Sequence, residues 1–158
     1  MIIRLLLLTV SLILSLPGQA AETLRVLTWP SYADSDLVRL FETQQGVRVD
    51  VNFVISDDLL RKKIGANQGD DFDVFAANTA ELQHCIDERL VVPLRLANIP
   101  NTTHQLPHFC EVARIPGIVR LGEVYAVPYT YSEMGLIFDR KQFKQPPTSL
   151  AAMWDPQQ

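Results

Sequence analysis

Residues 24–54 read LRVLTWPSYADSDLVRLFETQQGVRVDVNFV, and this pattern predicts a strand, a helix and a second strand in succession. The first strand covers residues 24–28, and apolar residues at helical spacing predict a helix over residues 35–45. Gly46 is placed to end this helix, because glycine adopts a left-handed backbone conformation without strain. Apolar and polar residues then alternate over residues 47–54, which is typical of a strand.

The alternation of strand and helix continues beyond residue 54. Ser56 or Asp57 can cap a second helix over residues 58–67, because both side chains can accept hydrogen bonds from a first helical turn. Residues 72–76 (FDVFA) predict a third strand, and their nearly continuous apolar character is typical of buried parallel strands.

A third helix follows, opened by Asn78 or Thr79 and running to about residue 89. Strands that alternate with helices of this length form parallel βαβ units. We therefore expect an α/β fold with an open, mostly parallel sheet.

After residue 90 the periodicity weakens and prolines are frequent. The remaining expected elements are a short helix within residues 101–108, a hairpin over residues 117–128 that turns at Gly122-Glu123, a strand at residues 134–138 and a helical turn at residues 150–154.

The first 20 residues predict a cleavable secretory signal peptide. Arg4 precedes an apolar run, and Gly18 and Ala20 have the small-residue spacing that a signal peptidase requires. The run is shorter than the roughly 20 residues that span a bilayer, which favours cleavage after Ala20 over an uncleaved membrane anchor. We expect a periplasmic mature chain that begins at residue 21.

Charge and cysteine content narrow the classes of partner. The chain has 18 acidic and 14 basic residues, a formal net charge of −4, and no run of Lys or Arg. Nucleic acid is therefore not an expected partner, whereas cationic ligands are slightly favoured. Cys85 and Cys110 form a disulfide or remain two free thiols, and no Cys/His spacing predicts a metal site or a cofactor.

Ligands of open α/β sheets bind at the carboxyl ends of the strands. Trp29 and Tyr32 follow the first strand, and such an aromatic pair suits stacking or a cation–π contact with an ammonium group. Asn78 and Thr79 follow the third strand at a helix N-terminus, where they either bind a ligand or simply cap the helix. Trp29 either binds a ligand or only covers the end of the sheet.

A third candidate group contains tyrosines and one acid, namely Tyr125, Tyr129, Tyr131 and Glu133. Tyrosine clusters line sugar and amine pockets and can bind ferric iron. Asp70, Asp71 and Asp73 have the positions of turn and strand-edge residues, and the three histidines are expected at the surface. The sequence has no catalytic motif, so we expect a binding protein and not an enzyme.

The chain also resembles a known family over its whole mature length. The segments that carry the resemblance are TWPSY at 28–32, GVRV at 46–49, GDDFDVF at 69–75, LVVPL at 90–94, VYAVPY at 124–129 and PPTSLAAMWDP at 146–156. In this order and spacing they are similar to periplasmic solute-binding proteins of ABC transporters, and most similar to the spermidine/putrescine-binding branch.

The resemblance implies a type II binding-protein fold, in which a ligand is held between two lobes that close by a hinge. It implies that Trp29 and Tyr32 line a polyamine site. It also places Asn78 and Thr79 at the family's polar positions after the third strand. The site residues expected in total are Trp29, Ser31, Tyr32, Asn78, Thr79, Tyr129 and Tyr131.

The family's proteins are longer than this chain, so the resemblance implies an N-terminal portion. Residues 21–131 correspond to the first lobe, and residues 132–158 to the hinge crossing and the start of a truncated second lobe. The expected function is capture of a polyamine or similar small cation for a membrane permease. The alternatives are a periplasmic sensor that signals to a membrane-bound enzyme, and a ferric-ion or anion binder that uses Tyr129 and Tyr131.

Overall fold

The structure is a computed structural model that describes residues 21–132, 135–143 and 145–154. The predicted signal peptide therefore lies outside the described residues. The chain divides into two compact units, Met1–Ala126 and Val127–Gln158. Each unit is considered by itself below.

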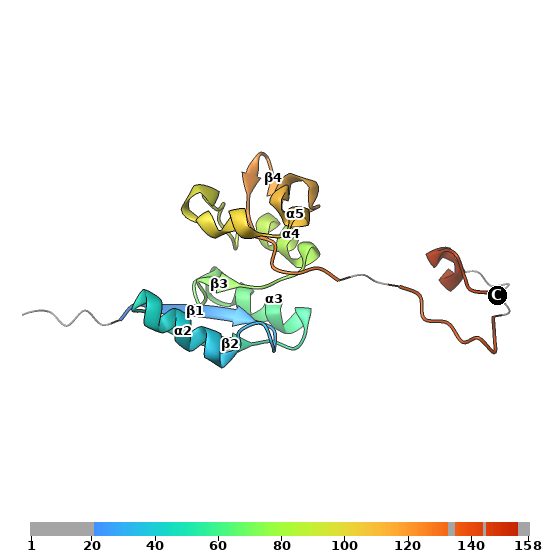
Figure 1. The fold of residues 1–158 in the computed structure, drawn as a ribbon, viewed down its shortest axis with the longest axis horizontal. Coiled ribbons are helices and arrows are strands. Elements are labelled where there is room, and N and C mark those ends of the chain that lie inside the picture. Colours follow the sequence, from blue (N-terminus) through green and yellow to red (C-terminus); the bar gives the residue numbers. More distant parts are fainter. Residues whose placement is uncertain (1–20, 133–134, 144, 155–158) are drawn as a thin grey trace, which may run out of the picture. The chain divides into compact units, whose positions relative to one another are not determined.

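The first unit contains a parallel sheet of three strands (Figure 1). Strands β1 (Thr23–Thr28), β2 (Arg48–Phe53) and β3 (Val74–Phe75) lie in the order β2-β1-β3. The predicted α/β fold with a parallel sheet is confirmed. Such a strand order requires each connection to cross over the sheet, and a helix fills each crossover.

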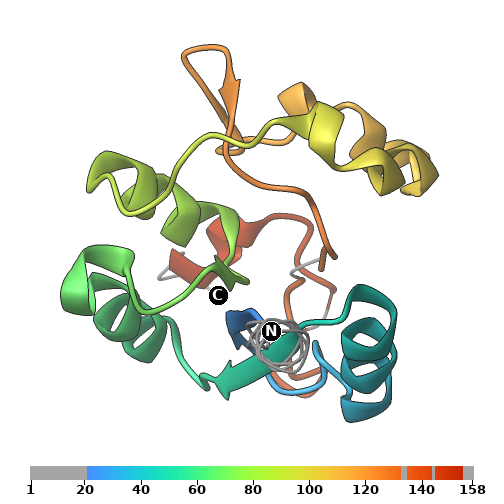
Figure 2. The ribbon, with the colours of Figure 1, turned by 90° about the vertical axis from the view of Figure 1, so that its left-hand side faces the viewer.

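The helices cover both faces of this sheet. Helix α2 (Ser35–Gln45) connects β1 to β2, α3 (Asp57–Gly65) connects β2 to β3, and α4 (Thr79–Asp87) follows β3. The two crossovers run in opposite directions along the sheet, so connections of the same hand place α2 and α3 on opposite faces. Figure 2 shows α2 on one side of the strands and α3 on the other.

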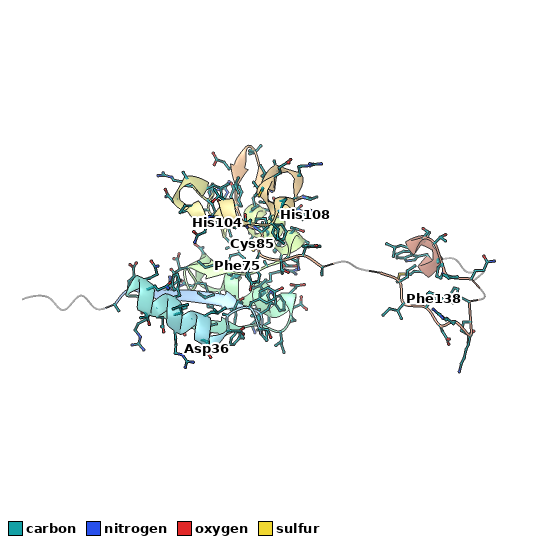
Figure 3. All side chains as sticks on the ribbon, in the orientation of Figure 1. Asp36, Phe75, Cys85, His104, His108 and Phe138 are labelled. Atoms are coloured by element: carbon teal, nitrogen blue, oxygen red, sulfur yellow. The ribbon has the colours of Figure 1, made fainter. Side chains whose placement is uncertain are left out.

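The hydrophobic core lies on the face that α3 and α4 cover. Its buried residues are Leu27, Val54, Leu60, Ile64 and Cys85, and Phe75 packs against them (Figure 3). Helix α2 contributes no buried residue, and its apolar side chains, among them Leu37 at 65% exposure, stay in contact with solvent. Most of the apolar burial that stabilises the unit is therefore on one face of the sheet.

Two predicted helix ends have the expected capping interactions, at Gly46 and at Ser56. Gly46 adopts a φ of 68°, and its N–H donates to the carbonyl of Glu42 at 2.9 Å, which ends α2. At the start of α3, the Ser56 hydroxyl accepts a hydrogen bond from the Leu59 N–H at 3.2 Å. Each bond satisfies a backbone group that the helix itself leaves unpaired.

Short elements complete the first unit. They are η1 (Ala66–Gly69), η2 (Leu96–Asn98), η3 (Pro100–His104), α5 (Pro107–Cys110), η4 (Val112–Arg114), β4 (Val119–Arg120) and β5 (Glu123–Val124). The β4–β5 hairpin confirms the predicted one, but its turn lies at Leu121-Gly122, one residue earlier than expected. Both turn residues have positive φ, 52° and 84°, as in the turns that suit two-residue hairpins.

Two strand predictions were wrong in part. Strand β3 has only two residues instead of the five predicted, and its Val74 is 52% exposed because β3 lies at the edge of the three described strands. In the second unit, residues 135–138 form no strand, and Ile137 is fully exposed. A strand needs a neighbour for its backbone groups, and none of the described residues pairs with this segment.

The described part of the second unit has one regular element, η5 (Leu150–Trp154), at the predicted position. The Ser149 hydroxyl accepts from the Ala151 N–H at 3.1 Å, and the rings of Phe138 and Phe143 meet edge to face at 6.2 Å. Across both units, the described helices are too short or too polar to cross a bilayer.

Candidate functional site

The carboxyl ends of the three strands meet at one edge of the sheet. Thr28 pairs with Phe53, and Leu27 pairs with Phe75, so β1, β2 and β3 end side by side. The chain leaves this edge in three loops that lead into α2, α3 and α4. Trp29, Ser31, Tyr32, Asn78 and Thr79, which the sequence predicts as site residues, lie in these loops or at the first position of α4.

Trp29 holds two of the three loops together. Its indole Nε1 donates to the carbonyl oxygen of Ala76 at 3.1 Å, which ties the end of β1 to the end of β3. The ring is partly buried and packs against the hydrophobic core. Trp29 therefore covers the end of the sheet, as one of its two predicted roles requires, and keeps part of its surface exposed to solvent.

Tyr32 and Ser31 lie in the turn after Trp29. The Tyr32 N–H donates to the Trp29 carbonyl at 3.2 Å, and Ser31 has a φ of 70°. Tyr32 is 39% exposed. An aromatic ring is thus presented to solvent three residues after the tryptophan, on the same loop.

Both polar atoms of the Asn78 side-chain amide form hydrogen bonds. The Oδ1 atom accepts from the N–H groups of Ala80 and Glu81, each at 3.0 Å, and Nδ2 donates to Oδ1 of Asp57 at 3.1 Å. The helix-cap role that the sequence allowed is therefore present. Thr79 is the first residue of α4 and is exposed.

A charged pair joins α3 to α4 behind this cap. The Arg61 guanidinium donates to both carboxylate oxygens of Glu81, at 3.1 and 2.5 Å. The hydrogen bonds from Arg61 lower the pKa of Glu81, and the Glu81 carboxylate in turn raises the pKa of Arg61. Glu81 is only 8% exposed, so its charge is satisfied within the protein.

The first turn of α3 adds two carboxylates to this edge, Asp57 and Asp58. Because Arg61 and Glu81 compensate each other, these two acids leave the edge with a negative balance. Sequence reasoning gave Asp57 only a capping role, which Ser56 fulfils instead. The contact of Asp57 with Asn78 joins residues 21 positions apart, and no local pattern indicates it.

The remaining tyrosines are distributed between the units. Tyr125 is half-buried in the first unit, where its N–H donates to the Ile118 carbonyl at 3.0 Å. Tyr129 and Tyr131 belong to the second unit and are 66% and 61% exposed. Glu133 lies outside the described residues.

The two cysteines are both free thiols, so the disulfide considered from the sequence is not formed. Cys85 is buried in the core on α4, whereas Cys110 lies at the surface, with its sulfur 3.6 Å from the Leu106 carbonyl oxygen. Burial raises the pKa of the Cys85 thiol. Among the histidines, His104 and His108 are exposed as predicted (Figure 3).

Two solved structures are similar to this chain. The chain is similar to a Listeria monocytogenes protein assigned to a spermidine/putrescine ABC transporter, with 27% sequence identity and a TM-score of 0.52. It is also similar to the substrate-binding protein of the Streptococcus pneumoniae spermidine/putrescine ABC transporter, in complex with calcium and HEPES, with 25% identity and a TM-score of 0.51. Each match covers 56% of this chain and 27% of the neighbour's chain.

A search of curated proteins finds no significant match. Residues 36–158, however, match the sequence profile of bacterial extracellular solute-binding proteins. The matched residues include α2 except Ser35, the strands β2 and β3, and the loops into α3 and α4. Since this match extends over most of the chain, the protein belongs to the family of bacterial extracellular solute-binding proteins.

Proposed function

We propose that this protein captures a polyamine, or a similar small cationic solute, at the carboxyl edge of its parallel sheet. The observation that carries the proposal is the joint placement of an aromatic pair and a carboxylate there. Trp29 and Tyr32 follow β1, and Asp57 is hydrogen-bonded to the cap of α4. The spermidine/putrescine assignment of both structural neighbours supports the same class of ligand.

Each group has a distinct role in this proposal. The rings of Trp29 and Tyr32 lie along the alkyl chain and attract its ammonium ends through their π faces. The carboxylate of Asp57 accepts hydrogen bonds from one ammonium group, and charge-assisted bonds of this kind are stronger than neutral ones. Thr79 offers a hydroxyl, and Asn78 keeps Asp57 in place. No bond of the solute is made or broken.

Tyr129 is also proposed as a ligand-binding residue, as the family resemblance implies for the segment that leads into the hinge, and Tyr131 is proposed because tyrosine clusters line amine pockets. The proposed location is the periplasm, reached through the signal peptide of residues 1–20. The proposed partner is the membrane permease of an ABC transporter. Residues 21–131 are proposed as the first lobe, and residues 132–158 as the hinge crossing and the start of the second.

Isothermal titration calorimetry tests the proposed ligand class. Putrescine and spermidine are titrated into the protein, and 1,4-butanediol serves as a control of equal chain length to putrescine without its charges. The proposal expects saturable heat for the amines, weakened by added salt because screening reduces attraction between charges. It is wrong if neither amine gives heat above the buffer, or if the diol binds as well as putrescine.

A further inference from the structure

We propose that Ser31 is a positioning residue, which acts through its left-handed backbone and not through its hydroxyl group. This inference rests on the proposed ligand site, because the turn that contains Ser31 places both aromatic side chains of that site. The sequence predicts Ser31 as one of the ligand-binding residues. Its left-handed backbone supports a positioning role instead.

The turn type follows from the backbone of residues 29–32. The Tyr32 N–H donates to the Trp29 carbonyl, so these four residues form a β-turn closed by one hydrogen bond. Pro30 occupies the second position, where its ring fixes a negative φ, and none of the described peptide bonds is cis. Ser31 occupies the third position with a φ of 70°. A negative φ followed by a positive one defines a type II turn.

Serine is an unfavourable choice for this position. Glycine or asparagine normally occupies the third residue of a type II turn, because a β-carbon is strained at positive φ. The strain at Ser31 is held by the anchors on either side. Trp29 is fixed to Ala76 through its indole N–H, and α2 begins at Ser35. Strained backbone of this kind persists only where the surrounding structure fixes it.

The consequence for the site is geometric. A type II turn rotates the peptide between Pro30 and Ser31, and this sets the direction in which Tyr32 leaves the loop relative to Trp29. If residue 31 moved to its preferred negative φ, the peptide between Pro30 and Ser31 would turn over and the four residues would form a different turn, such as type I. The two rings would then no longer be presented to a ligand in the relation that the type II turn sets.

Three substitutions separate the backbone role from a hydroxyl role. Ser31→Gly and Ser31→Ala both remove the hydroxyl, and Ser31→Ala keeps the β-carbon that serine already has at this φ. We expect Ser31→Gly to keep the putrescine affinity within about twofold and to raise the Tm by about 2–5 °C. We expect Ser31→Ala to keep the affinity within about twofold as well. Ser31→Val, whose branched β-carbon disfavours positive φ most strongly, is expected to lower the affinity about five- to tenfold.

The order of the turn is measured in a variant whose one remaining tryptophan is Trp29. Trp154→Phe leaves Trp29 as the single tryptophan of the chain, so its near-ultraviolet circular dichroism reports the order of the turn directly. The inference is overturned if Ser31→Ala loses affinity, if Ser31→Val binds as tightly as the wild type, or if Ser31→Gly lowers the Tm. If no variant binds any amine, the proposed ligand is wrong, but the Tm values and the Trp29 signal still decide the role of the turn.

Discussion

The side-chain amide of Asn78 donates from Nδ2 to Oδ1 of Asp57 at 3.1 Å, and this bond joins the first turn of α3 to the cap of α4. It fixes a carboxylate at the edge where the strands end. Because the Oδ1 atom of Asn78 is occupied by two backbone N–H groups, we propose that Asn78 serves the site indirectly, by holding Asp57.

Replacing Asp57 by Asn removes the negative charge but keeps an oxygen that can accept the bond from Asn78. We expect the fold to be retained and the affinity for putrescine to fall about tenfold, which corresponds to roughly 1.4 kcal/mol. This loss lies near the contribution of a hydrogen bond to a charged group. Calorimetry measures the affinity, and circular dichroism checks the fold.

Asp58→Asn is the matched control, since it removes an equal charge one residue further along the first turn of α3. Asp58 is exposed, and its charge is screened by salt more readily than that of the half-buried Asp57. We expect less than about a twofold effect at physiological salt. Equal losses for the two variants would mean that only the overall negative charge attracts the ligand, and that Asp57 does not contact it.

The sequence predicted α2 and the starts of α3 and α4 closely, because caps and turns depend on neighbouring residues. Gly46 ends α2, and Asn78 caps α4, through bonds to groups within four positions of each. The hydrogen bond between Asp57 and Asn78 could not be predicted, for the opposite reason. The two residues are distant in the sequence, and only the packing of α3 beside α4 brings them together.

The strand predicted at residues 134–138 is absent from its described part, residues 135–138, for a related reason. An apolar run favours a strand, but backbone pairing requires a second strand, and no described residue of the second unit provides one. Trp29 and Asn78 lie at strand ends as predicted, whereas their ligand-binding roles stay predictions. Backbone strain at Ser31 could not be predicted, since serine gives no local signal for positive φ.

Gly117 is expected to be sensitive to substitution, because the loop that holds it packs closely on α4. Its φ is 87°, and a β-carbon there would lie 2.5 Å from Nε2 of Gln83 and 3.1 Å from the Thr79 carbonyl oxygen. We expect Gly117→Ala to lower the free energy of unfolding by about 2 kcal/mol, from backbone strain and overpacking together. Urea denaturation measures this change.

Gly46→Ala separates the two contributions. Gly46 also has positive φ, 68°, but nothing lies within 4 Å of the added β-carbon, so only the backbone strain remains. We expect a loss of about 1 kcal/mol for this variant. If Gly117→Ala costs no more than Gly46→Ala, the loop does not pack on α4 as closely as the structure has it.

Thiol reactivity checks the placement of the two cysteines. Cys110 is exposed, whereas Cys85 is buried and its pKa is raised by burial, so little reactive thiolate is available there. We expect Ellman's reagent to react rapidly with one thiol in the native protein and with two after unfolding. Cys110→Ser should abolish the rapid reaction. A protein that shows no thiol even when unfolded without reductant would have the disulfide that the structure lacks.

The ion pair of Arg25 and Asp73 makes stability depend on pH in a defined window. Hydrogen bonds from the Arg25 side chain and backbone N–H lower the pKa of Asp73 to about 2, whereas an unfolded Asp titrates near pH 3.9. Between about pH 4 and pH 2 the unfolded chain therefore binds more protons at this position, and the stabilisation is lost as the pH falls. Both side chains are over a third exposed, so we expect a small effect.

Urea denaturation of the wild type and of Asp73→Asn at several pH values measures this contribution. We expect the difference in unfolding free energy to stay constant from pH 7 to pH 5 and to shrink as the pH falls from about 4 towards 2. In an Arg25→Gln background the same comparison should lose most of its pH dependence, because the guanidinium that holds the carboxylate is gone; the backbone N–H of residue 25 still donates to residue 73 and accounts for the remainder. A difference that stays constant down to pH 2 in the wild-type background would show that Asp73 titrates at the same pH in the folded and unfolded chains.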